Sequence, residues 1–312
     1  MIREKIIVGK GTKYALNGIL TLPDSKECPV PAVVLVHGSG ASNMDERIMK
    51  LTPFKDIAEG LAAHGIASIR YDKRTYAHPI RLLTDKSQPM TVKAETIDDA
   101  ILATELLRKD PRIDPDRIFI IGHSMGGMLA PRIDAEGGNY RGIIIMAGSP
   151  RRLEEILVEQ LDEMLAGMSK PLRKLAGKSV NKMTSKFDGM YELSDEEACK
   201  VKLGGGTTLY YFKEMGEPPV SYYLERTDKP LLIMQGAKDL QVKLDRDFET
   251  YKELLCGREN AIFKLYENLN HAFVDAIYDN ISMSKKEYAK ERHIGDEVIT
   301  DIAEWINSTA RK

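Results

Sequence analysis

The chain has 312 residues, of which 43% are hydrophobic and 29% are charged. This composition is typical of soluble globular proteins and excludes general disorder. The 45 basic and 47 acidic residues leave a net charge of −2, so the total charge favours neither nucleic acid nor an anionic membrane as a partner. At roughly 100–200 residues per domain, the length predicts two domains or one large domain with an insertion.

Short apolar runs along the chain predict a sheet. Residues 2–8 and 15–22 are expected to form an opening pair of strands, because Asn17-Gly18 and Pro23-Asp24 are turn signals. Further apolar runs without polar alternation are typical of strands buried on both faces of a parallel sheet. These strands are predicted at 32–36, 66–71, 117–122, 142–146, 231–235 and 261–266.

Amphipathic segments separate these strands. In residues 54–64, for example, Phe54, Ile57 and Leu61 share one helical face and Gly65 is a natural stop. Similar helices are predicted at 96–109, 248–255 and 297–306. The alternation of strands and helices predicts a doubly wound α/β fold with a mostly parallel sheet.

Residues 151–229 interrupt this alternation, because they contain no run of the buried-strand type. A structureless loop of this length is improbable in a compact domain. We expect a helical cap here, inserted into a core formed by residues 1–150 and 230–312. The alternative is a solvated surface elaboration without a role in catalysis.

The cysteines and the N-terminal residues indicate in which cellular compartment the protein is expected. Cys28, Cys199 and Cys256 are too few and too far apart for a disulfide framework or a metal-binding CxxC pair. The first residues lack the apolar core of a signal peptide, and no segment has the roughly 18 apolar residues of a transmembrane helix. We therefore expect a cytoplasmic protein that does not interact with a membrane.

The most specific motif is Gly-His-Ser-Met-Gly at residues 122–126, directly after a predicted strand and before a predicted helix. This is the G-x-S-x-G turn that exposes a nucleophilic serine, here Ser124. Glycines two residues before and after the serine are needed because side chains there would collide with neighbouring backbone. Ser124 is therefore the predicted nucleophile.

A serine hydroxyl needs a base, and the base needs an orienting acid. In folds with this turn the chain order is serine, acid, histidine. Asp239 follows the predicted strand 231–235, and His271 follows the strand 261–266. Both therefore fall at carboxyl ends of parallel strands, where open α/β sheets place their sites. We predict Asp239 as the acid and His271 as the base.

Other acids and histidines fit less well. Asp245 and Asp247 do not directly follow a strand, and His293 has no strand before it, which favours a surface position. His64 ends a helix, His78 falls outside the usual chain order, and His123 is expected to point away from the attack site and to pack.

Acyl transfer also requires donors to the oxyanion. The first is predicted to be the backbone N–H of Met125, the residue after the nucleophile. The second is expected from the loop His37-Gly38-Ser39-Gly40 after the strand 32–36, and is assigned to Ser39.

The motifs HGSG, RYDKR, GHSMGG and GAKD…NH resemble those of the α/β-hydrolase superfamily. They are most similar to bacterial serine esterases and cinnamoyl-esterase-like enzymes of the dienelactone-hydrolase and acylaminoacyl-peptidase-like branch. The resemblance covers residues 1–150 and 230–312. It implies a Ser124–Asp239–His271 triad, the donors Ser39 and Met125, carboxylic-ester substrates, and neither a metal nor an organic cofactor. The nucleophile is serine and not cysteine, which favours esters over lactones.

Four other features have no assigned catalytic role. Asp72, Lys73 and Arg74 are expected to tie loops together by ion pairs, and the glycines 204–206 to form a lid hinge. The basic run 170–186 is expected to be a solvated helix face. Two tyrosine pairs are equally compatible with a substrate pocket and with packing inside the cap: Tyr210-Tyr211 and Tyr222-Tyr223.

The sequence therefore predicts a serine hydrolase that cleaves esters with small or aromatic acyl groups. A peptidase or amidase, and an acyltransferase, stay open because they use the same triad. A non-catalytic binding protein is disfavoured by the intact triad. The small-molecule ester is the only partner expected, and the choice between monomer and homodimer is open.

Overall fold

The computed structural model of the protein describes residues 1–24, 29–85, 87, 89–204 and 206–309. Within these residues, eight strands form one sheet in the order β1-β2-β4-β3-β5-β6-β9-β10. The strands are β1 (Ile2–Val8), β2 (Leu16–Leu22), β3 (Val30–Val36), β4 (Ala67–Tyr71), β5 (Ile113–His123), β6 (Ile143–Met146), β9 (Leu231–Gly236) and β10 (Ala261–Tyr266).

The predicted sheet is confirmed, including the opening pair of strands. The turn expected at Asn17-Gly18 is wrong, because both residues lie inside β2 and pair with β1. β1 pairs with β2 and β2 pairs with β4 in antiparallel register, and every later pairing from β4 to β10 is parallel. β5 begins four residues before its predicted start at Arg117. Its pairing with β3 shifts register between Val30 and Ala32, which leaves Pro115 and its polar neighbours unpaired with β3.

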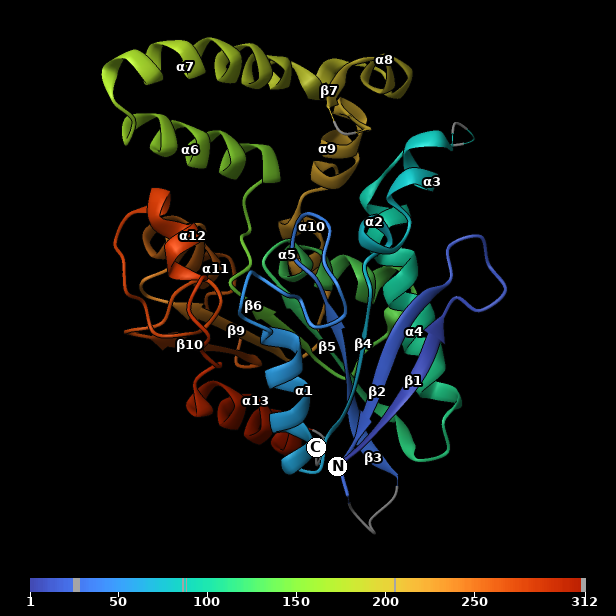
Figure 1. Ribbon diagram of the computed structural model, residues 1–312. Helices are drawn as coiled ribbons and strands as arrows, with labels where there is room; N and C mark the ends of the chain where they lie inside the picture. Colours follow the sequence, from blue (N-terminus) through green and yellow to red (C-terminus); the bar gives the residue numbers. More distant parts are fainter. Residues whose placement is uncertain (25–28, 86, 88, 205, 310–312) are drawn as a thin grey trace.

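Helices cover both faces of this sheet (Figure 1). The helices of the core are α1 (Pro53–Ala63), α2 (Arg74–Ala77), α3 (Pro79–Thr84), α4 (Asp98–Lys109), α5 (Met125–Ile133), α11 (Glu249–Leu254), α12 (Ser284–Glu287) and α13 (Asp296–Thr309). The predicted helix at 96–109 divides into a π-helical turn, Lys93–Ile97, and α4. The predicted helix at 248–255 similarly follows a π-helical turn, Leu244–Phe248.

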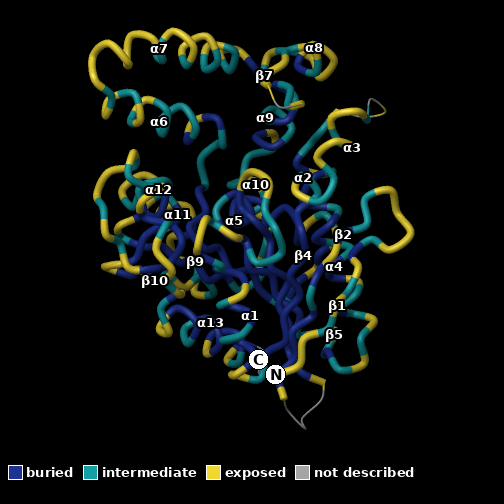
Figure 2. Tube along the Cα trace, in the orientation of Figure 1, coloured by how far each residue is buried: buried dark blue, intermediate teal, exposed yellow. Residues whose placement is uncertain are grey.

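The alternation of side chains along each strand separates two cores. Val33 and Leu35 of β3 pack with Phe54 of α1 and Val298 of α13 on one face. Val34 of β3 belongs instead to the core beneath α4, α5 and α11. Because both faces are covered, all seven residues of β3 are buried, as its apolar run predicts. The chain course is darkest, meaning most buried, along these central strands (Figure 2).

The segment 151–229 is mainly helical. It contains α6 (Leu153–Ala166), α7 (Lys170–Thr184), α8 (Asp195–Lys200), α9 (Leu209–Gly216) and α10 (Val220–Arg226), with a two-stranded β7 (Lys202–Gly204) and β8 (Thr207–Thr208). Helices α6 to α9 lie above the carboxyl ends of the central strands (Figure 1), whereas α10 packs against α5 of the core. The hinge expected at glycines 204–206 includes Gly205, which lies outside the described residues.

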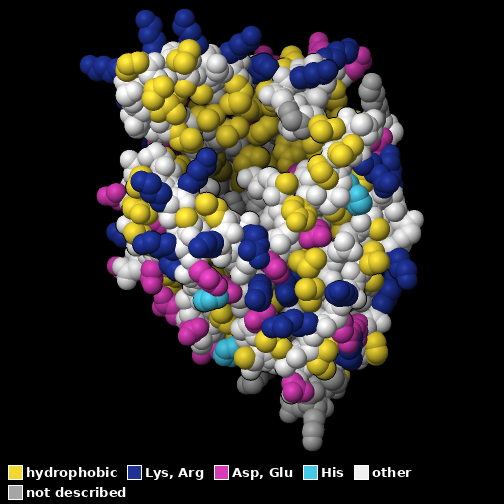
Figure 3. Space-filling model, viewed as in Figure 1, with side chains coloured by type: hydrophobic (Ala, Val, Ile, Leu, Met, Phe, Trp, Pro, Cys, Tyr) yellow, Lys and Arg dark blue, Asp and Glu magenta, His cyan; other side chains and the backbone are white. Residues whose placement is uncertain are grey.

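The surface between α6–α9 and the core is hollowed, and hydrophobic side chains gather there (Figure 3). Lysine and arginine side chains stand on the outer side of this layer, consistent with the solvated basic face expected for 170–186. No helix in the described part of the chain is long and apolar enough to span a membrane.

Candidate active site

Ser124 occupies a sharp turn between the end of β5 and the start of α5. Its backbone has φ 53° and ψ −121°, a strained conformation for a residue with a side chain. A Cβ atom added to Gly122 would lie 2.1 Å from the carbonyl oxygen of Gly126, and one added to Gly126 would lie 2.2 Å from that of Val36. The steric reason predicted for both glycines is therefore confirmed.

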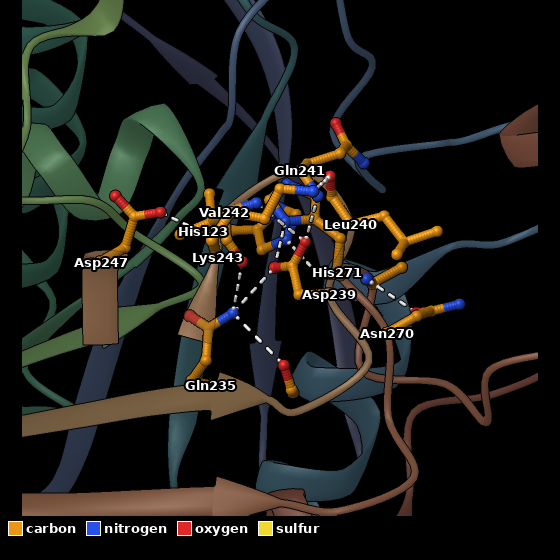
Figure 4. Close-up of polar contacts among 12 residues, drawn as sticks. His123, Gln235, Asp239, Leu240, Gln241, Val242, Lys243, Asp247, Asn270 and His271 are labelled. Carbon is orange, nitrogen blue, oxygen red and sulfur yellow. Dashed lines mark hydrogen bonds and ion pairs between the residues drawn. The ribbon is translucent and has the colours of Figure 1, made fainter. Parts of the chain in front are cut away.

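Asp239 and His271 come together at the carboxyl ends of neighbouring strands β9 and β10. His271 Nδ1 lies 2.7 Å from Asp239 Oδ2, and both side chains are buried (Figure 4). With Nδ1 bonded to a carboxylate, the imidazole presents Nε2 as its proton acceptor.

The Asp239 carboxylate is held by three further donors. The backbone N–H groups of Gln241 and Val242 donate to Oδ1 at 2.7 and 3.0 Å. The Gln235 side-chain amide donates to Oδ2 at 3.0 Å (Figure 4). These bonds fix the carboxylate, which in turn fixes the imidazole ring.

The loop that carries His271 is fixed by its neighbour Asn270. The Asn270 side chain accepts a hydrogen bond from the N–H of Ala272 at 3.0 Å and donates one to Glu287 at 2.8 Å. The backbone of Asn270 also donates to the carbonyl of Val274 at 3.0 Å. The turn is therefore closed by local bonds that do not involve the imidazole.

Ser39, Ser124 and Met125 line one cavity of about 160 Å³. The loop after β3 passes close to the nucleophile, since a Cβ on Gly38 would lie 3.1 Å from that of Ser124. The structure thus brings the predicted nucleophile and both predicted oxyanion residues together. It shows no hydrogen bond between the hydroxyl of Ser124 and His271, two residues that are both described.

The remaining wall of this cavity is mostly apolar and comes partly from the inserted segment. Leu153, Ile156 and Leu157 of α6 and Phe212 of α9 face the core residues Met128 and Val242, with Gln160 and Gln241 beside them. None of the four tyrosines of the two pairs lines it. Residues of α6 and α9 thus line the same cavity as Ser124.

Glu46 is a residue of the site that sequence reasoning missed. It is buried, and its carboxylate accepts the N–H of Gly38 at 2.8 Å and lies 3.0 Å from His123 Nδ1. His123 Nε2 then donates to the carbonyl oxygen of His271 at 2.8 Å. The expectation that His123 only packs is thus incomplete, because it joins the loop after β3 to the loop that carries His271. Only spatial proximity reveals this link.

Glu46 and His123 each favour the charged form of the other. Burial lowers the pKa of His123, but the charge of Glu46 and the hydrogen bonds to Glu46 and to the carbonyl of His271 together leave the pKa above its ordinary value. Burial raises the pKa of Glu46, yet the charge of His123 and the hydrogen bonds from His123 and from the N–H of Gly38 together hold that pKa below its ordinary value. By contrast, burial lowers the pKa of nearby His37 to about 4. Ionised Glu46 and His123 therefore form the charged pair behind the site.

The ion pairs expected of this cluster are present for Lys73 and Arg74, whereas Asp72 makes a hydrogen bond to the backbone instead. Asp72 accepts the N–H of Met44 at 2.8 Å. Lys73 lies 3.4 Å from Glu95 and donates to the carbonyl of Gly38 at 2.8 Å. Arg74 pairs with Asp99, its Nε lying 3.0 Å from Oδ2. The cluster therefore ties the loop after β4 to the loop after β3, to the π-helical turn before α4 and to the start of α4.

The disfavoured residues occupy structural positions. Asp247 is fully buried and accepts hydrogen bonds from Ser149 at 2.5 Å and from Arg151 at 2.7 Å. His293 is exposed and lies 3.0 Å from Asp56. Within the described ranges, no group of three or more His, Cys, Asp or Glu side chains is placed to hold a metal ion.

Comparison with known proteins now defines the class. The model of the Alpha/beta hydrolase family matches residues 33–275, so the chain belongs to this family. The chain is 34% identical over 295 residues to Esterase EstD of Thermotoga maritima, which covers 95% of this chain and 66% of EstD. It therefore spans just under two thirds of the length of that curated relative.

Solved structures share the fold. Est1E from Butyrivibrio proteoclasticus, solved with ferulic acid bound, matches with a TM-score of 0.60 and 16% identity, over 98% of this chain and 100% of Est1E. The Pyrococcus furiosus esterase Pf2001 matches with a TM-score of 0.58 and 15% identity, over 98% and 91% of the two chains. At these identities the likeness concerns the fold alone.

Proposed function

We propose that the protein is a carboxylic-ester hydrolase that forms an acyl-enzyme on Ser124, with His271 as the base and Asp239 as the orienting acid. The observation that carries this proposal is the buried hydrogen bond of 2.7 Å between His271 and Asp239, at the edge of the sheet where the strained turn also presents Ser124. The identity to EstD supports esters as the substrate class.

The reaction follows from these positions. His271 Nε2 removes the proton of the Ser124 hydroxyl as its oxygen attacks the ester carbonyl. The imidazolium is stabilised by Asp239 and then gives its proton to the departing alcohol. Water, deprotonated by His271, attacks the acyl-enzyme, and the carboxylic acid leaves as Ser124 regains a proton.

The developing oxyanion needs donors at the same place. The backbone N–H groups of Ser39 and Met125 are our candidates, because both residues line the cavity of Ser124. A preorganised pair of amide donors is worth several kcal/mol in the transition state and costs no solvent reorganisation.

The cavity supports a small acyl group. Its volume of about 160 Å³ and its mostly apolar walls suit a short aliphatic chain or a single aromatic ring, because an apolar cavity of about 150 Å³ is large enough to bind benzene. We include α6 to α9 in the proposal as a cap that closes over the acyl group and limits its length.

The experiment is hydrolysis of p-nitrophenyl esters from acetate to decanoate, with Ser124→Ala as the control. We expect turnover that falls as the acyl chain lengthens and that disappears in the variant, while a fluorophosphonate labels only the protein with Ser124. Activity that persists in Ser124→Ala would overturn the proposal. Labelling without turnover of any ester would transfer the assignment to an amidase or an acyltransferase.

A further inference from the structure

Gly38 is held at both of its backbone polar groups by buried ions of opposite sign. Its N–H donates to Glu46 at 2.8 Å, and its carbonyl accepts from Lys73 Nζ at 2.8 Å. The Lys73 side chain is only 2% exposed. A lysine this buried is rare in folded proteins, and it occurs where a specific partner requires it.

The charge of Lys73 is balanced by Glu95 of the π-helical turn Lys93–Ile97, and Glu95 in turn contacts α9. Glu95 lies 3.4 Å from Lys73 Nζ, and the hydroxyl of Tyr211, on α9, donates to Glu95 at 2.5 Å. Burial lowers the pKa of Lys73, and the charge of Glu95 opposes this. Replacing a buried ion pair by apolar groups is often neutral or stabilising, so fold stability by itself gives no strong reason for a lysine here.

The bonded carbonyl belongs to the same peptide unit as the N–H of Ser39. In a planar trans peptide these two groups point in opposite directions. An ammonium that fixes the carbonyl therefore fixes the direction of the N–H as well, and its charge polarises the amide so that the N–H becomes a stronger donor.

We propose that Lys73 is a positioning residue that orients and strengthens the Ser39 N–H as an oxyanion donor. The inference rests on the proposed function, in which that N–H binds the oxyanion. Other constraints on this peptide are weak, since Ser39 and Gly40 are exposed and Gly40 has φ 82°. Through Glu95 and Tyr211, the position of α9 is linked to the same peptide.

The test compares Lys73→Met with the double variant Lys73→Met/Glu95→Gln, which leaves no unpaired carboxylate. Turnover is measured per active site, titrated to completion with a fluorophosphonate. We expect kcat per titrated site to fall about 10–100-fold in both, less than or equal to the loss of a whole oxyanion donor. We expect KM to change by less than about threefold, because the donor acts mainly in the transition state.

Thr104→Val is the matched structural control, because Thr104 makes a buried hydrogen bond of 2.6 Å to Tyr140 outside the site. It should lower the Tm but keep kcat per titrated site. If the role of Lys73 were only structural, its variants would also have a lower Tm and an unchanged kcat per titrated site. Unchanged kcat per titrated site in the Lys73 variants, or failure of both to fold, would overturn the inference. Failure of the proposed function is distinguishable from this result, because in that case the Ser124→Ala variant would keep the activity of the wild type.

Discussion

The ring of His123, the residue before the nucleophile, donates a hydrogen bond of 2.8 Å to the backbone carbonyl of His271. The two rings also pack together, with centroids 4.9 Å apart. The backbone of His271, the proposed base, is therefore fixed directly to the end of the strand β5 that precedes Ser124. Glu46, on the other side of His123, extends this connection to the loop after β3.

The ionised pair of Glu46 and His123 predicts how stability depends on pH. The pKa of His123 is raised in the folded state, so its contribution is complete below about pH 6.5, the ordinary value, and is lost as pH rises through the folded pKa. The pKa of Glu46 is lowered, so its contribution is lost only as pH falls below about 4.5 toward the folded value.

We therefore expect the Tm of the wild type to decrease above about pH 6.5 more steeply than that of the double variant Glu46→Gln/His123→Gln. The single variant Glu46→Ala should cost about 3 kcal/mol in unfolding free energy near neutral pH, because it leaves an unpaired buried charge. Thermal melts from pH 5 to 9 measure both effects. Parallel curves for the wild type and the double variant would contradict the charged state of this pair.

The Asp239→Asn variant tests the proposed role of Asp239 as the acid that orients His271. Asp239→Asn should lower kcat about 10³–10⁴-fold with little change in Tm, because the amide disfavours the imidazole tautomer that accepts a proton at Nε2. Asp245→Asn is the matched control, since Asp245 is exposed and lies outside the site. Steady-state kinetics on p-nitrophenyl acetate decide the matter, and equal activities of the two variants would remove Asp239 from the triad.

The strained turn makes a prediction about stability. Gly126→Ala places a Cβ 2.2 Å from the carbonyl oxygen of Val36, and relief of this clash moves backbone, at a cost of about 3 kcal/mol or more. Gly177→Ala, in α7, has no atom within 4 Å of the new Cβ and should gain about 0.5–1 kcal/mol. Urea unfolding distinguishes the two, and similar midpoints would show that the turn can relax.

Phe212 is the aromatic wall that α9 contributes to the cavity. Phe212→Ala should therefore shift the preference for acyl length upward, raising kcat/KM for hexanoate relative to acetate by about tenfold. Leu172→Ala, on an exposed part of α7, should leave that ratio unchanged. If both variants keep the wild-type ratio on p-nitrophenyl esters, α9 does not limit the acyl group.

Much of the fold followed from local patterns. Buried parallel strands carry continuous apolar runs, and residues such as those of β3 were therefore recognisable without a structure. The less predictable boundaries lie where tertiary contacts override local preference. β5, for example, extends back through Pro115 because its register shifts against β3, and a proline gives no sign of such a shift.

The sequence by itself determined the family, the G-x-S-x-G turn, and the candidates Ser124, Asp239 and His271, because each is defined by residue type and by its place after a strand. Only the tertiary structure decided which buried ions hold the loop after β3. Glu46 contacts Gly38 and His123, Lys73 contacts Gly38, and Glu95 pairs with Lys73. These residues come from separate parts of the chain, and their pairing depends on the shared desolvation of charges that no single segment contains.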